Sequence, residues 1–214
     1  MGNGPSLLSC DLNRLARETT IVSNANYLMW DQLDYVPTFL TVEDSLTAED
    51  RASDLQSLQG CVRIFPFDLR RFLGDSGETL LYLNLLRNYA PFPKFSWNVA
   101  HHAYWGGTVS FLNLLIAAFL GCNPIILIGF DHSYVVPASE TDNVVIRSHD
   151  ADVNHFSPDY LGPGQRWYAP NVPRMEAAYR HAHGELEQAG YKVLNATPGG
   201  KLEVFERVSL DSIL

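Results

Sequence analysis

Short runs of hydrophobic residues alternate with longer, more polar segments along most of the chain. The clearest run is 125–128, four aliphatic residues in succession, which is typical of a strand buried on both faces of a sheet. It follows an apolar segment, 109–120, which predicts a buried helix that stops at Gly121. Because polar residues and Pro124 interrupt the stretch 109–130, it predicts no transmembrane segment.

The same alternation extends over the rest of the chain. Further strands are predicted at 19–23, 37–42, 61–65 and 191–194, and further helices at 6–16, 43–58, 79–88 and 173–189. Residues 135–170 are rich in Asp, Asn, His, Pro and Gly, which predicts a long active-site loop. Strands that alternate with helices favour a parallel sheet. We therefore expect an α/β protein with one Rossmann-like, three-layer domain over residues 1–214, in which this loop covers the carboxyl edge of a mostly parallel sheet.

The start of the chain has an unusual pattern. Met1 is followed at once by the run Gly2-Asn3-Gly4-Pro5-Ser6, a glycine turn of the kind that normally ends a strand. Since no strand precedes the turn in this sequence, we expect the first strand of the sheet to be missing. Glycines allow close approach of the backbone, and the N–H groups of a following helix attract anions. The run predicts an anion-binding loop, with an ordinary turn as the alternative.

Composition and charge narrow the function classes. The chain has 214 residues, of which 46% are hydrophobic, and its net charge is -9. An acidic protein is a poor nucleic-acid binder, because phosphate contacts need an excess of Lys and Arg, but backbone amides can still hold a small anion. The three cysteines form no CxxC pair, and no secretory signal is evident. Free thiols in a reducing compartment, and hence a cytoplasmic location, are expected.

Candidate ligand-binding residues follow the expected strands. In open parallel sheets, ligands bind beyond the carboxyl ends of the strands. Asn24 follows the first predicted strand and offers a donor and an acceptor for a ribose or a base edge. Glu43 and Asp44 follow the second and could bind a hydroxyl or a divalent ion, or cap a helix. Gly107 and Thr108 open the apolar helix and predict a second anion-binding turn.

The strongest cluster directly follows the aliphatic run. Gly129, Asp131, His132 and Tyr134 place an acid, an imidazole and a phenol at one strand end. Such groups are costly to bury, so they are candidates for phosphate contact or proton transfer, with a structural role as the alternative. In the long loop, His155 is the preferred general base or acid. The histidine spacing matches no firm metal pattern.

Several of these segments combine into one recognisable set. They are residues 2–7, 24, 107–109, 120–121, 128–134, 154–156 and 195–202. Together they resemble the bacterial sialyltransferase-like and motility accessory factor proteins. The same superfamily contains archaeal MptE-like enzymes, which resemble 6-hydroxymethylpterin diphosphokinase. The resemblance spans nearly the whole chain and implies a Rossmann-like fold that binds a nucleotide.

For the sialyltransferases, the resemblance implies a CMP-linked sialic-acid-like donor and no strict need for a metal. The implied donor contacts are Asn3, Gly4, Ser6, Asn24 and Thr108, with Tyr134 in the place of a phosphate-binding tyrosine. The family's catalytic histidine corresponds to Asp159 or Tyr160, a few residues beyond His155. The leading expectation is thus a glycosyltransferase that takes a nucleotide-sugar substrate and modifies a cell-surface glycan or flagellin.

Two alternatives stay open. A pterin pyrophosphokinase would use ATP and magnesium, and Asp44 or Asp131 would then carry the metal. A protein that binds a nucleotide without catalysis is the third reading. No other cofactor is expected, and the sequence leaves the formation of a homo-oligomer open.

Overall fold

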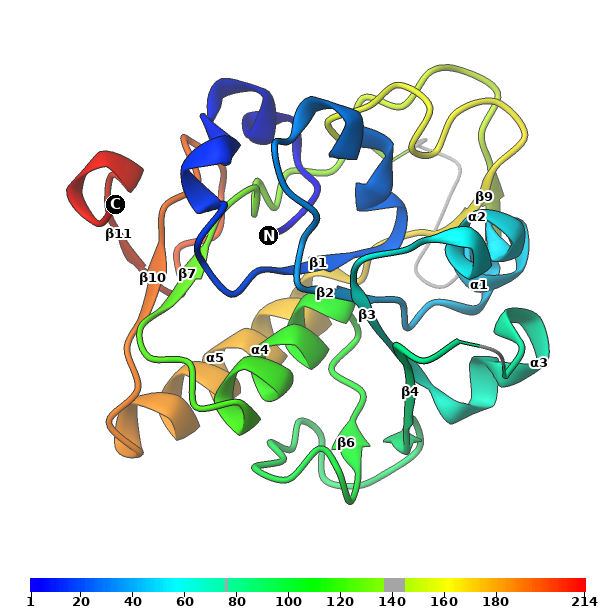
Figure 1. Cartoon of the computed structure of the whole chain (residues 1–214). Helices are drawn as coiled ribbons and strands as arrows, with labels where there is room; N and C mark the ends of the chain where they lie inside the picture. Colours follow the sequence, from blue (N-terminus) through cyan, green and yellow to red (C-terminus); the bar gives the residue numbers. More distant parts are fainter. Residues whose placement is uncertain (76, 137–144) are drawn as a thin grey trace.

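A computed structural model of the chain describes residues 1–75, 77–136 and 145–214 and has a mixed α/β architecture, compatible with a Rossmann-like fold (Figure 1). The central sheet has four parallel strands in the order β1-β2-β3-β4. They are β1 (Ile21–Ser23), β2 (Phe39–Thr41), β3 (Val62–Pro66) and β4 (Leu80–Leu83). Predictions for the first three strands are confirmed, and the parallel direction brings their carboxyl ends to one edge.

A second parallel sheet has the order β11-β10-β7. Its strands are β7 (Ile125–Leu127), β10 (Val193–Asn195) and β11 (Glu206–Arg207). Two short pairs complete the strands: β5 (Leu85–Leu86) lies parallel to β6 (Ala103–Tyr104), and β8 (Val145–Arg147) lies antiparallel to β9 (Arg166–Tyr168). The predicted strands at 125–128 and 191–194 are therefore present within a residue or two of their expected bounds.

The start of the chain connects the two parallel sheets. The amino group of Met1 donates to the carbonyl oxygen of Ile21 at 2.6 Å, and the N–H of Gly2 donates to that of Ile128 at 2.7 Å. A Cβ on Gly2 would lie 2.2 Å from the carbonyl oxygen of Gly129. Glycine is thus required here because the loop packs directly on the backbone beyond β7.

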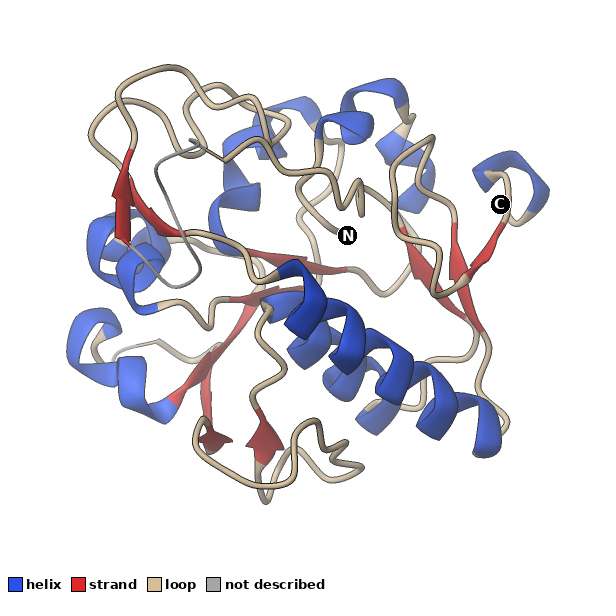
Figure 2. Ribbon diagram, turned by 180° about the vertical axis from the view of Figure 1, so that it is seen from behind, coloured by secondary structure: helices blue, strands red, loops and turns tan. Residues whose placement is uncertain are grey.

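Two long helices lie side by side next to the sheets (Figure 2). They are α4 (Val109–Phe119) and α5 (Val172–Gln188). Helix α4 is mostly apolar, and its residues Phe111–Ala118 are buried. Within it, Asn113 accepts from the hydroxyl of Thr41 at 2.7 Å and donates to that of Ser23 at 2.7 Å. These buried hydrogen bonds fix the helix against the ends of β1 and β2.

The remaining helices are short. They are α1 (Ser45–Asp50), α2 (Ala52–Ser57) and α3 (Arg70–Leu73), with 3-10 turns η1 (Pro5–Ser9), η2 (Leu12–Leu15), η3 (Asn24–Gln32), η4 (Phe67–Leu69) and η5 (Leu210–Ser212). The helix predicted over 43–58 is divided between α1 and α2 at Arg51. In the described part of the chain, no helix has both the length and the apolar character needed to cross a membrane.

Three predictions differ from the structure. The helix expected over 79–88 is wrong, because the leucines there pair with β3 as β4 and continue into β5. The helix expected over 6–16 is two 3-10 turns, and the side chain of Asp11 caps the second. The long loop 135–170 contains the β8–β9 pair, while its residues 137–144 lie outside the described residues.

Candidate functional site

The loops that follow separate strands meet at a small cavity of about 130 Å³. Residues lining it include Gly2, Asn3, Gly4, Asn24, Thr108, Gly129, Asp131, His132, Tyr134, Asn154, His155 and Tyr160. Most of the residues that the sequence singled out are therefore brought together. Ser6 contacts Asp131, whereas Asp44 and Gly107 line a neighbouring cavity.

That neighbouring cavity is larger, about 640 Å³, and it shares lining residues with the small cavity. Asn24, Thr108, Tyr134, Asn154, His155 and Tyr160 border both cavities. Beyond this junction, the larger cavity is bordered by Glu43, Arg87, Trp105, Trp167 and Arg174, among others. The site is thus a cleft with two chambers, and His155 lies where they join.

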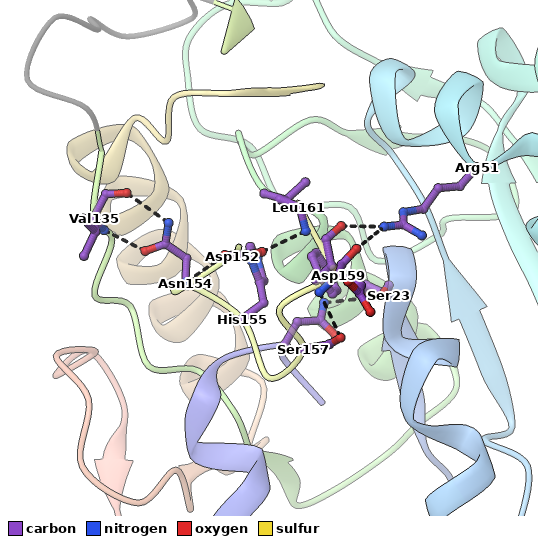
Figure 3. Close-up of polar contacts among 11 residues, drawn as sticks. Ser23, Arg51, Val135, Asp152, Asn154, His155, Ser157, Asp159 and Leu161 are labelled. Atoms are coloured by element: carbon purple, nitrogen blue, oxygen red, sulfur yellow. Dashed lines mark hydrogen bonds and ion pairs between the residues drawn. The ribbon is translucent and has the colours of Figure 1, made fainter. Parts of the chain in front are cut away.

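His155 is held by a buried carboxylate (Figure 3). Its Nδ1 lies 2.6 Å from Oδ2 of Asp152, whose side chain is 2% exposed and also accepts from the N–H groups of Asn154 and Leu161. Burial raises the pKa of Asp152, but the hydrogen bonds with His155, Asn154 and Leu161 outweigh this effect, and the pKa of Asp152 is below its usual value. An ionised Asp152 makes Nδ1 the protonated nitrogen and leaves Nε2 for a ligand.

The loop around His155 is anchored from several sides. The imidazole stacks on the ring of Tyr160, with centroids 3.9 Å apart. Arg51 donates to the carbonyl oxygens of Asp159 at 2.8 Å and Tyr160 at 2.6 Å (Figure 3). The N–H of Phe156 donates to the carbonyl oxygen of Asn3 at 3.0 Å. A titratable group that is oriented by packing and hydrogen bonds is a general requirement for proton transfer.

The acid beyond β7 has a local structural role. Both oxygens of Asp131 accept from Ser6, one from its N–H at 3.1 Å and one from its hydroxyl at 2.6 Å. A Cβ on Gly4 would lie 1.8 Å from Asp131 Oδ2. The Gly-Asn-Gly-Pro-Ser turn therefore packs around this carboxylate, which lines the small cavity but is already hydrogen-bonded.

The neighbouring imidazole and phenol differ in environment. The His132 side chain is 4% exposed, and its Nε2 lies 3.5 Å from a carboxylate oxygen of Glu176. Burial lowers the pKa of His132, although Glu176 opposes this effect. Burial also raises the pKa of Tyr134 far above its usual value, so its phenol stays protonated and can donate a hydrogen bond.

Asn24 has the backbone and side-chain features of a ligand-binding residue. Its φ is +55°, a left-handed conformation that Asn tolerates better than most residues. Its Oδ1 is buried, and no donor to it is found among residues 1–75, 77–136 and 145–214. Because Asn24 borders both chambers, this oxygen is placed to accept from a ligand there.

Both carboxylates that the sequence suggested for magnesium are already hydrogen-bonded within the protein. Asp44 accepts from the N–H of Thr47 at 2.7 Å and thereby caps α1, while Asp131 is bonded to Ser6. Within the described residues, no three His, Cys, Asp or Glu side chains are grouped as a metal site would require. Neither predicted position therefore offers a preformed magnesium site made of protein groups alone.

The sequence reasoning did not select Trp105 or Arg174 for the site, and it did not identify Asp152 as the partner that orients His155. Asp152 carried a usable signal, because an acid three residues before His155 can reach it. Glu43 was selected together with Asp44 as a possible partner for a hydroxyl or a divalent ion, because both follow a strand end. Trp105 and Arg174 lie in a loop and at the start of α5, and no local pattern marks them as ligand-binding residues.

Comparison of the chain with protein-family models, with curated proteins and with solved structures finds no match. The class that the fold and the site define is a mixed α/β protein with parallel strands whose carboxyl ends border a two-chambered cleft.

Proposed function

We propose that the protein is a cytoplasmic transferase with a Rossmann-like, three-layer fold that uses a nucleotide-activated sugar. The proposed donor is a CMP-linked sialic-acid-like sugar, and the proposed acceptor belongs to a cell-surface glycan or to flagellin. The choice of donor rests on the resemblance in the loops that surround the small chamber.

The observation that carries the proposal is the His155–Asp152 pair at the junction of the two chambers. A buried carboxylate that orients an imidazole is a recurrent arrangement for general-base catalysis. The stacking of His155 on Tyr160 is relevant too, because the resemblance puts the family's catalytic histidine at Asp159 or Tyr160. His155 and Tyr160 are thus separate positions in the sequence whose side chains lie side by side in the structure.

The chambers suggest how the substrates are divided. The small chamber, about 130 Å³, has room for a phosphate group, and the protonated phenol of Tyr134 can donate to it. Asn24 Oδ1 can accept from a ribose hydroxyl. The larger chamber, about 640 Å³, has room for the rest of the donor and for the acceptor.

In the proposed reaction, an acceptor hydroxyl attacks the anomeric carbon while its proton moves to Nε2 of His155. The bond between the anomeric carbon and the phosphate oxygen breaks, and its electron pair leaves on CMP. Asp152 stabilises the imidazolium that forms, and Tyr134 stabilises the leaving phosphate. His155 then releases the proton to water.

The test measures CMP release from CMP-N-acetylneuraminate by wild-type protein and by three variants. His155→Ala should lower turnover at least about 100-fold while CMP still raises the melting temperature, because the base acts on the acceptor. Asp152→Asn should also lower turnover. His149→Ala, an exposed histidine of the same loop, is the matched control. Unchanged turnover in His155→Ala would exclude His155 as the base.

The pyrophosphokinase alternative has less support, since Asp44 and Asp131 already serve the structure as described above. A nucleotide that binds with no turnover of any donor would instead support the non-catalytic alternative.

A further inference from the structure

One wall of the larger chamber is formed by three residues from separate parts of the chain. Glu43 follows β2, Trp105 follows β6, and Arg174 lies in the first turn of α5. Trp105 connects the other two. Its Nε1 donates to Oε1 of Glu43 at 3.0 Å, and its ring centroid lies 4.7 Å from the guanidinium carbon of Arg174. The wall therefore holds one acidic side chain, Glu43, and one basic side chain, Arg174, at fixed positions.

Arg174 carries a positive charge with no carboxylate beside it. In the described residues, Arg87 and Arg166 form ion pairs with acids, but Arg174 forms none. Its guanidinium carbon also lies 4.0 Å from the ring centroid of Phe92, and its Nε is buried without an acceptor in the described chain. An arginine packed against two aromatic rings is preorganised to bind an anion.

Glu43 provides a second polar contact. It is 5% exposed, and its Oε2 is buried with no donor in the described part of the chain. The charged groups around it are Arg87, which donates to its carbonyl oxygen at 2.8 Å, and the acids Asp44 and Asp68. A buried carboxylate oxygen without a partner gains most from a ligand group that donates, such as a hydroxyl.

The rest of the chamber suits a ring-shaped ligand. Trp105, Trp167 and Tyr168 contribute aromatic side chains to its lining. Chambers with apolar walls and a few fixed polar groups bind small molecules by stacking and set their orientation by the polar contacts. A sugar ring presents C–H groups to such walls and hydroxyls to a carboxylate.

We propose that Glu43, Trp105 and Arg174 form the acceptor subsite of the cleft and that it takes a sugar acid. The carboxylate of the ligand binds Arg174, a ring hydroxyl donates to Glu43, and the ring packs on Trp105. This inference rests on the proposed transferase function, because it assigns the acceptor side of the same cleft.

The test compares glucuronate with glucose, which carries a hydroxymethyl group where glucuronate has a carboxylate. Each is titrated into the full-length protein in the presence of CMP, and binding is followed by ligand-observed NMR. The wild-type protein should bind glucuronate at least about 10-fold more tightly than glucose, since a charge-assisted contact is lost with glucose. Equal affinities would overturn the proposal.

Three variants assign the effect to residues. Arg174→Gln should abolish the preference for glucuronate, whereas Arg174→Lys should keep part of it, because the charge remains. Arg180→Gln is the matched control, since Arg180 is exposed on the same helix. At pH 8, above the pKa of Glu43, the variant Glu43→Gln should weaken both sugars by a similar factor, because an amide is a weaker acceptor than a carboxylate. A preference that persists in Arg174→Gln would refute the role of Arg174.

The transferase proposal is tested separately in the same samples. Binding of CMP to each variant is measured by thermal shift, and the sugar titrations are repeated without CMP. Sugar-acid binding that depends on Arg174 while CMP fails to bind would sustain the subsite and contradict the transferase. Binding of CMP with no preference for glucuronate would contradict the subsite and leave the transferase proposal standing.

Discussion

The substitution Glu43→Gln tests the electrostatics of the cleft through stability alone. Gln has nearly the shape of Glu and can still accept from Trp105, but it carries no charge. Burial is the largest influence on Glu43 and raises its pKa from 4.5 to about 7. Arg87 and Trp105 oppose the effect, while Asp44 and Asp68 add to it. The charged form is thus disfavoured in the folded state.

The magnitude follows from linkage between protonation and folding. One pKa unit corresponds to about 1.4 kcal/mol, so the charge on Glu43 costs the folded state roughly 3 kcal/mol when fully developed. Below pH 4.5 the cost is absent, because Glu43 is protonated in the folded and the unfolded chain. Between pH 4.5 and about 7 the unfolded chain loses the proton first, and the folded state becomes progressively less favoured.

The assay is urea denaturation of wild type and Glu43→Gln at several pH values from 4.5 to 8. The free energy of unfolding of the variant minus that of wild type should rise by roughly 3 kcal/mol over this range and then level off. Using the difference removes contributions from groups common to both proteins. Glu187→Gln, at an exposed position that forms no ion pair within the described residues, is the control and should give a nearly flat difference because burial does not desolvate this side chain. A flat difference for Glu43→Gln as well would refute the reasoning.

Three further substitutions test the packing around the cleft, each by chemical denaturation. Gly4→Ala should cost about 1–3 kcal/mol, because its Cβ would lie 1.8 Å from the Asp131 carboxylate; wild-type stability would show that the turn is looser than described. Asn113→Ala should cost roughly 1–3 kcal/mol by leaving the buried hydroxyl of Thr41 without its 2.7 Å acceptor, and a neutral effect would argue against that bond. Leu115→Ala, at a site with 0% exposure, should cost about 2–5 kcal/mol, and a loss below 1 kcal/mol would contradict close packing of α4.

Much of the sheet could be predicted because its strands are short apolar runs between polar segments. The runs that become β1, β3 and β7 are buried on both faces or nearly so, which leaves little doubt about their type. The type of the segment that becomes β4 was not predictable in this way. Its leucines fit a helix as well as a strand, and Leu81 is 53% exposed; pairing with β3 decides the outcome.

The candidate site was predictable where it depends on strand ends. Asn24, Thr108 and Asp131 are far apart in sequence but line one cavity, because parallel strands deliver the loops that follow them to a shared edge. The hydrogen bond between Asp131 and Ser6 joins positions 125 residues apart, so the structural role of Asp131 could not be predicted from a local pattern. Trp105 and Arg174 meet only through tertiary packing, which explains why the sequence did not mark them.

The most direct test of the account is a thermal-shift panel with CMP, CDP, ATP and GTP, each with and without magnesium. A ligand that binds the native state raises the melting temperature by mass action, so the ranking identifies the nucleotide. The account predicts the largest rise with CMP, and the same rise when magnesium is left out. A rise only with ATP and magnesium, or no rise with any nucleotide, would contradict it.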